Sequence, residues 1–211
     1  MLRLTMPTTG SVLIGGADVA FIDELELRRG IAGVPQEVQL FPGSVRENVS
    51  MFDGDVADAA INAALMAVGL GGWLAAQSNG LDTRLLDRTE AATGMSAGES
   101  QLLALARALV RNPSIVVLDE ATSRVDPRTQ LLVKRAVAEL LSGRTSVVIA
   151  HRLDTLDVCD DIAVLEDGHI VELGERLLLA ADPESLFAKL LRTGGMLSDG
   201  ATVDDLIDST L

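Results

Sequence analysis

The chain has 211 residues and a net charge of −14 at pH 7, and its hydrophobic content of 48% is sufficient for a substantial buried core. Such a negative charge argues against broad nucleic-acid binding, which requires Lys and Arg to neutralise phosphates. No apolar stretch is long enough to span a bilayer, so we expect a cytoplasmic chain without direct membrane insertion. The single thiol, Cys159, cannot form an intramolecular disulfide.

The first part of the chain alternates short strands with helices. In order, the pattern predicts a strand at 11–14, a helical turn at 25–29, a strand at 31–34, a helix at 56–68, a short helix from Trp73 and a loop-like stretch at 79–94. The strand at 31–34 should end at Pro35. The helix at 56–68 has Asp53 or Asp55 available as its N-cap.

The second part continues the alternation. In order, the pattern predicts a helix at 98–111, a strand at 115–118, a helix at 126–141, a strand at 146–150, a hairpin at 162–173 and a helix from Asp182. Residues 115–118 are four large, mainly β-branched aliphatics, as in a buried strand of a parallel sheet. Strands that alternate with helices in this way predict an α/β fold.

Two adjacent carboxylates, Asp119 and Glu120, follow the strand at 115–118. The carboxyl ends of strands are where doubly wound α/β sheets carry their chemistry, so this pair could bind a metal and activate a nucleophile. Taken alone, the pair could equally be a solvated strand end.

The order of further motifs favours a catalytic role for this pair. Along the chain come Gln36 after a strand, Ser96-Ala97-Gly98-Glu99 at the start of a helix, Asp119-Glu120, Ser123 and Asp126, and His151 after the next strand. This succession resembles the nucleotide-binding domain of the ATP-binding cassette (ABC) family. The resemblance implies ATP and Mg²⁺ as cofactors and the reaction of ATP with water to ADP and phosphate.

The resemblance also implies a role for each catalytic position. Asp119, in the Walker B motif, holds Mg²⁺ together with Gln36 of the Q-loop. Glu120 polarises the attacking water as general base, and His151 contacts the γ-phosphate. Phosphoryl transfer depends mainly on charge neutralisation and positioning, which these residue types can supply.

The stretch from Met95 to Glu99 resembles the family signature, usually L-S-G-G-Q, with Met95, Ala97 and Glu99 as departures. In the family, the four residues Ser96, Ala97, Gly98 and Glu99 would contact ATP bound to a second nucleotide-binding domain in a dimer. Ser123 and Asp126 resemble the D-loop at the same interface. An alternative interpretation is that Ser96 and Glu99 form a helix capping box.

The implied fold is a partial P-loop NTPase core, a RecA-like parallel sheet with an inserted α-helical signature subdomain. We expect the domain to span 1–195, with the helical subdomain at about 53–112 and an acidic tail at 196–211. Segments 42–49 and 89–94 resemble the exporter version of the family. The expected partners are therefore the transmembrane domains of an exporter, which would hold the chain at the inner face of the membrane.

The family's phosphate loop, G-x-x-x-x-G-K-[S/T], is not present in these 211 residues. The two lysines, Lys134 and Lys189, lack the glycines that the loop requires, and the upstream adenine-stacking aromatic is missing as well. By resemblance the domain is N-terminally truncated. We therefore expect marginal folding, with exposed strand edges, and little ATP turnover from this chain alone.

Three interpretations remain open. The first is the ATPase domain of an exporter-type ABC transporter. The second is a non-enzymatic fragment that offers its signature half-site to a partner subunit. A phosphate loop encoded in frame upstream would favour the first, and an intervening stop codon the second. The third, a cassette protein of translation or DNA repair, fits neither the exporter-like segments nor the acidic charge.

Overall fold

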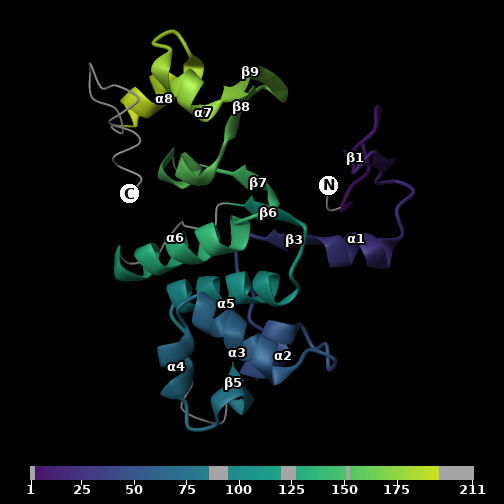
Figure 1. Ribbon diagram of the computed structural model, residues 1–211, viewed down its shortest axis with the longest axis vertical. Helices are drawn as coiled ribbons and strands as arrows, with labels where there is room; N and C mark the ends of the chain where they lie inside the picture. The colour runs from purple at the N-terminus through teal and green to yellow at the C-terminus, as the bar shows by residue number, and fades with distance from the viewer. Residues whose placement is uncertain (1–2, 86–94, 120–126, 151–152, 195–211) are drawn as a thin grey trace. The chain divides into compact units, whose positions relative to one another are not determined.

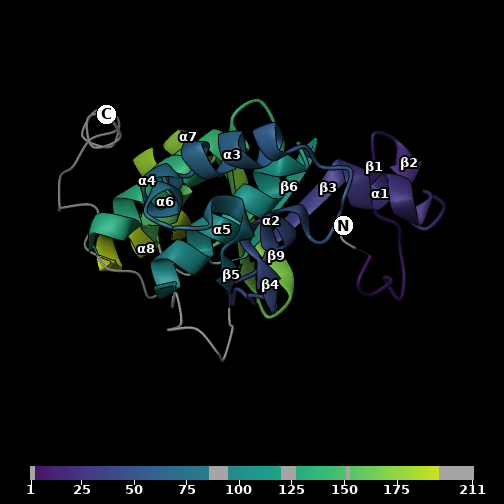
Figure 2. The same cartoon turned by 90° about the horizontal axis from the view of Figure 1, so that it is seen from below.

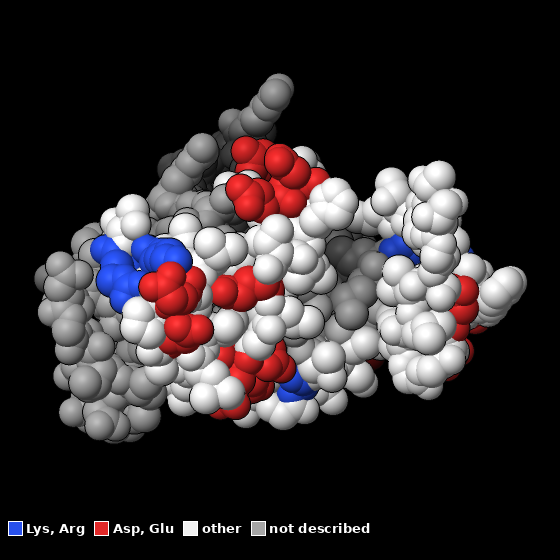
Figure 3. All heavy atoms as spheres, turned by 90° about the horizontal axis from the view of Figure 1, so that it is seen from above, with Lys and Arg blue, Asp and Glu red and all other residues white. Residues whose placement is uncertain are grey.

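The computed structural model describes residues 3–85, 95–119, 127–150 and 153–194 (Figure 1). The chain divides into two compact units, Met1–Ile149 and Ala150–Leu211. None of the helices within the described ranges is long and apolar enough to cross a bilayer. On the face drawn in Figure 3, red Asp and Glu side chains form several patches and blue Lys and Arg side chains are fewer, in keeping with the net charge of −14.

A three-stranded parallel sheet forms the centre of the first unit. Its strands lie in the order β3 (Ile31–Val34), β6 (Ile115–Asp119) and β7 (Thr145–Ile149). Val34 pairs with Leu118, and Asp119 pairs with Ile149. Because the strands are parallel, their carboxyl ends share one edge of the sheet. The predicted α/β fold with a parallel sheet is confirmed.

Helices cover this sheet and supply most of its core. The two long helices are α5 (Ala97–Val110) and α6 (Pro127–Leu141), which pack on each other, and α5 also contacts β3. Leu103 and Leu105 of α5 and Leu140 of α6 are completely buried. Each such side chain contributes about 1.5–3 kcal/mol through its transfer from water. Both helices were predicted, α5 from its apolar spacing and α6 from its Asp126-Pro127 start.

Smaller elements lie beyond α5, where α2 and α3 pack against it (Figure 1). They are β4 (Gly43–Ser44), α2 (Val45–Ser50), α3 (Asp58–Ala67), α4 (Gly71–Ala75), the 3₁₀ turn η1 (Gly80–Asp82) and β5 (Arg84–Leu85). The predicted cap of α3 is wrong: its N-cap is Ala57, without a side-chain hydrogen bond, because the Asp53 carboxylate accepts from the Asp55 amide instead. The stretch predicted as loop contains η1 and β5, and residues 86–94 lie outside the described ranges.

The amino-terminal elements lie beside the start of β3 (Figure 2). They are the hairpin strands β1 (Leu13–Ile14) and β2 (Ala17–Asp18) and the helix α1 (Glu24–Gly30). The Asp23 carboxylate caps α1 by accepting from the amides of Leu25 and Glu26. The predicted strand and helical turn are therefore both present.

The second unit is built around a two-stranded hairpin. Its elements are the 3₁₀ helix η2 (Leu153–Val158), β8 (Asp161–Glu166), β9 (His169–Glu175), α7 (Arg176–Ala181) and α8 (Leu186–Thr193). The hairpin turns at Asp167-Gly168 as predicted, with φ of 48° and 78°, which is the geometry that suits the twist of the strands. Phe187 and Leu191 of α8 pack into a core with Ile162.

The last helix begins later than predicted, at Leu186 rather than at Asp182-Pro183. The reason is a tertiary cap. The Ser185 hydroxyl accepts from the Ala188 amide, and the Glu172 carboxylate of β9 accepts from the amides of Leu186 and Phe187. The preceding helix α7 had not been predicted.

Candidate functional site

The carboxyl edge of the parallel sheet brings two predicted site residues to neighbouring strand ends. Asp119 is the last residue of β6, and Gln36 follows the end of β3 by two residues. Since Val34 and Leu118 are paired in the ladder, the chain after β3 leaves the sheet next to Asp119. Both residues are exposed at this edge. The arrangement arises from two aliphatic strands, the first of which is ended by Pro35.

Four other predicted site residues lie outside the described ranges. These are Glu120, Ser123, Asp126 and His151. In the sequence, Glu120 directly follows β6, and His151 follows β7 by two residues. Their roles stay predictions that rest on the order of the motifs.

The donor set at the sheet edge suits magnesium. Asp119 offers a carboxylate and Gln36 a carboxamide oxygen, and hard oxygen ligands of this kind are what Mg²⁺ prefers. Mg²⁺ is commonly bound through one or two carboxylates and the phosphates of a substrate. Among the described residues there is no group of three or more His, Cys, Asp or Glu that could hold a metal ion.

The signature residues form the first turn of α5. Ser96 is the N-cap: its hydroxyl accepts from the Glu99 amide at 3.2 Å, while the Glu99 carboxylate accepts from the Ser96 amide at 2.8 Å. The capping box that was one interpretation of the sequence is therefore present. Ser96 and Ala97 are exposed and Gly98 is buried.

This helix start retains the properties of an anion site. The first amides of a helix lack intrahelical acceptors, and the helix dipole favours negative charge at its amino end. The Ser96 hydroxyl uses a lone pair towards Glu99, so its own proton can still be donated. The Glu99 carboxylate, however, adds a negative charge beside the position that a phosphate would take. The structure thus allows both roles in the same four residues.

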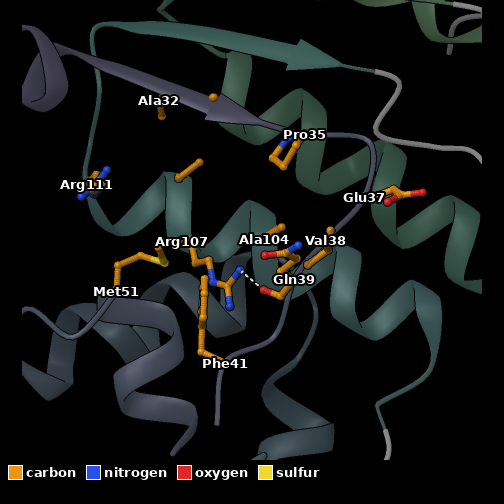
Figure 4. Close-up of a pocket in the computed structure, with 12 residues that line it drawn as sticks. Ala32, Pro35, Glu37, Val38, Gln39, Phe41, Met51, Ala104, Arg107 and Arg111 are labelled. Carbon is orange, nitrogen blue, oxygen red and sulfur yellow. Dashed lines mark hydrogen bonds between the residues drawn. The ribbon is translucent and has the colours of Figure 1, made fainter. Parts of the chain in front are cut away.

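A cavity of about 430 Å³ opens beside the segment that follows Gln36 (Figure 4). Pro35, Val38 and Phe41 line one side, and Ala104 and Arg107 of α5 line the other. This cavity had not been predicted from the sequence, because its two sides come from distant parts of the chain.

Arg107 is the residue at this site that sequence reasoning missed. Its guanidinium donates to the Gln39 carbonyl at 2.7 Å and to the Asn48 carbonyl and side-chain oxygen at 2.9 Å each. It also lies 5.3 Å from the centroid of the Phe41 ring, a cation–π distance. Burial lowers the pKa of Arg107 from its usual value, although the group stays charged. An arginine within the Leu- and Ala-rich run of α5 was the available signal.

Comparison with known proteins matches residues 1–123 to the family described as ABC transporter. ABC transporter B family member 18 of Arabidopsis thaliana is 42% identical over 193 residues, which are 90% of this chain and 15% of that protein. The β-(1→2)glucan export ATP-binding/permease protein NdvA of Mesorhizobium japonicum is 38% identical over 197 residues, 93% of this chain and 33% of that protein.

A solved structure described as a bacterial Atm1-family ABC exporter with ATP bound aligns with a TM-score of 0.80 and 32% identity. The alignment covers 92% of this chain and 34% of that one. The chain thus spans about a third or less of each of these three relatives. From the family match over more than half of its residues and from these exporter relatives, the chain belongs to the ABC transporter family, as a nucleotide-binding domain of the exporter type.

Proposed function

We propose that this chain acts as the nucleotide-binding domain of an ABC exporter, in which ATP binding and hydrolysis drive export through a transmembrane partner, whereas the 211 residues alone turn over little ATP. The observation that carries the proposal is the meeting of Asp119 and the Gln36 segment at one edge of the parallel sheet. Strand ends at such an edge are the usual ligand site of open α/β sheets. The oxygen donors there suit a magnesium ion that is also held by nucleotide phosphates.

In this proposal the residues divide the work of phosphoryl transfer. Asp119 and Gln36 would hold Mg²⁺, which would supply charge neutralisation for the phosphate oxygens. Glu120 takes the proton of the attacking water, and His151 donates a hydrogen bond to the γ-phosphate. The motif order supports these last two roles.

A second nucleotide-binding domain completes the site in this proposal. The turn from Ser96 to Glu99 faces the γ-phosphate of ATP held by that second domain, and Ser123 and Asp126 line the same interface. The exposed Ser96 and Ala97 at the start of a 14-residue helix support this assignment.

The transmembrane partner would dock in the cavity beside the Gln36 segment and hold the chain at the inner face of the membrane. The cavity is lined largely by apolar side chains such as Val38, Phe41 and Met51. A concave apolar surface of this kind suits a short amphipathic helix. Its wall includes the residues that directly follow Gln36, so an occupant would contact the chain next to the proposed metal site.

ATP-dependent association tests the signature half-site that this chain contributes to such a dimer. The chain is mixed with a nucleotide-binding domain of an exporter that has its own phosphate loop and whose catalytic glutamate is replaced by glutamine, so that ATP stays bound. We expect a one-to-one complex in sedimentation velocity that requires ATP and Mg²⁺. Ala97→Glu should weaken it by about tenfold or more, since a carboxylate then opposes the γ-phosphate.

The matched control is Ala60→Glu, which adds the same charge at an exposed position of α3. A glutamate in the first turn of α5 interacts favourably with the helix dipole, so Ala97→Glu should not weaken the association by unfolding that helix. Association that does not depend on ATP, or equal weakening by both variants, would contradict the proposed function.

A further inference from the structure

The segment 35–41 contains no helix or strand, and much of one side of it faces the cavity. It therefore lacks both a hydrogen-bonded ladder and close packing along that side. Val38 and Leu40 pack against the hydrophobic core, and hydrogen bonds to the backbone of the segment are found at its far end, near Gln39 and Phe41.

Asn48 of α2 is the first of these contacts. Its side chain is completely buried, and its oxygen accepts from the Phe41 amide at 2.9 Å. Its NH₂ group donates to the Phe41 carbonyl at 2.9 Å and to the Ser44 carbonyl at 3.0 Å. One amide side chain thus replaces the backbone partners that a strand would give to Phe41.

Arg107 joins this arrangement to α5. It donates to the Gln39 carbonyl and to both oxygens of Asn48, and it lies against the Phe41 ring, as Figure 4 shows for the Gln39 bond. Gln39 and Asn48 are 68 and 59 residues away from Arg107 in the sequence. The guanidinium therefore closes a long-range connection between the Gln36 segment, α2 and α5.

Helix α5 carries this connection to the signature. Ser96 caps the helix, and Arg107 follows it by eleven residues, or ~16 Å along the helix axis. Leu102, Leu103 and Leu105 between them are buried, so α5 is held as a rigid element. A shift of the signature end is then transmitted to Arg107.

We propose that Arg107 is a positioning residue that ties the Gln36 segment to the signature helix, so that engagement of Ser96 restrains the backbone after Gln36. Only the ligand at Ser96 rests on the proposed function, while the tie itself rests on the contacts above. The planar guanidinium is required because three donors must point to three acceptors at once. Lysine has one ammonium on a flexible stem and cannot reproduce that geometry.

Hydrogen–deuterium exchange of the full chain tests the tie. In Arg107→Lys, amide exchange in residues 36–42 should rise by about tenfold or more, because hydrogen bonds from a charged donor are lost, while exchange in β3 and β6 stays unchanged. The control is Arg111→Lys. Arg111 lies on the wall of the same cavity, and its replacement should leave the exchange rates of residues 36–42 as in the original chain. Unchanged exchange in 36–42, or an equal rise in β3 and β6, would overturn the proposal.

A second measurement separates positioning from a purely structural role. Exchange in residues 36–42 is compared with and without the ATP-loaded partner domain described above. Binding should slow exchange clearly in the original chain. In Arg107→Lys it should slow exchange only weakly, although both chains bind the partner domain. Equal slowing in the two chains would overturn the tie. If the original chain does not bind at all, the proposed function fails. The exchange rates of the unbound chains then still show whether Arg107 holds residues 36–42 in place.

Discussion

Among single residues, Glu99 carries a negative charge that its capping box does not need. Its carboxylate closes the capping box on the Ser96 amide, yet it stands where the family signature usually has glutamine. Glutamine can also close a capping box, so the box does not require the charge. The negative charge instead opposes any phosphate that approaches the start of α5.

Glu99→Gln should therefore leave the free energy of unfolding within about 0.5 kcal/mol of the original value. It should strengthen association with the ATP-loaded partner domain severalfold, because the repulsion of the γ-phosphate is removed. Denaturant titration and sedimentation velocity measure the two effects.

Glu99→Ala serves as the comparison. It removes the charge as well, but it also opens the box, so the free energy of unfolding should fall by about 0.5–1 kcal/mol. If Glu99→Gln weakened the association, the carboxylate would have to contact the nucleotide site favourably.

At the scale of elements, the helix α8 depends on a carboxylate from another element. Glu172 is partly buried, which raises the pKa of its carboxyl, but hydrogen bonds from the amides of Phe187 and Leu186 and from the Ser185 hydroxyl outweigh this, so the pKa lies below its ordinary value of 4.5. A lowered folded-state pKa stabilises the fold above the unfolded pKa and loses that contribution as pH falls through the folded pKa.

We expect this contribution to be present at pH 7 and lost at a pH below 4.5. In Glu172→Gln, amide exchange at the start of α8 should be faster at pH 7 and should change less on acidification than in the original chain, after correction for intrinsic rates. Glu175→Gln is the control on the same strand. Equal pH dependence in all three chains would show that Glu172 does not stabilise α8.

The strand β7 forms an edge of the sheet with apolar side chains in contact with solvent. Among the described residues it pairs only with β6, and Val147 and Ile149 are 37% and 47% exposed. An open edge that carries apolar side chains is a site for association between chains. This observation agrees with the expectation of exposed strand edges.

Ile149→Lys should therefore reduce self-association of the purified chain, as measured by sedimentation velocity, because it removes apolar surface and adds charge at the edge. Thr145→Lys adds the same charge at the other end of β7 without removing a large apolar side chain. It should have the smaller effect. An equal effect of both variants would assign the association to net charge instead of the apolar edge.

The elements also show what can be predicted from the sequence. The β-branched run at β6 and the Asp167-Gly168 turn are local signals, and both were predicted correctly. The six-residue helices α2 and α7 are too short for a helical period to be visible. The start of α8 was missed because a strand residue caps it.

The residues of the candidate site also differ in whether they can be predicted from the sequence. Gln36 and Asp119 were predicted because motif order identifies them without knowledge of the structure. Arg107 could not be found in this manner, since its acceptors are backbone and amide oxygens of a distant segment. Every residue type has a backbone carbonyl group, so a contact to a carbonyl oxygen cannot be recognised from the type of residue that carries it.

At the scale of the whole molecule, the 211 residues combine candidate metal ligands with a signature turn but contain no phosphate loop. Asp119 and Gln36 can hold Mg²⁺ only weakly by themselves, because much of its coordination would come from nucleotide phosphates. The loop that cradles those phosphates supplies backbone amides and a lysine. Nucleotide binding at the chain's own sheet edge should accordingly be weak.

The purified 211-residue chain should therefore show no magnesium-dependent ATP turnover above that of its Glu120→Gln variant, measured by phosphate release. The positive control is the same chain joined to the strand, phosphate loop and following helix of a related exporter, in which turnover should appear and should again be lost with Glu120→Gln. Clear turnover by the unmodified chain would contradict this prediction and would mean that other residues bind the phosphates. In the joined chain the two forms differ only at Glu120, so their difference in turnover also tests whether this chain supplies the general base.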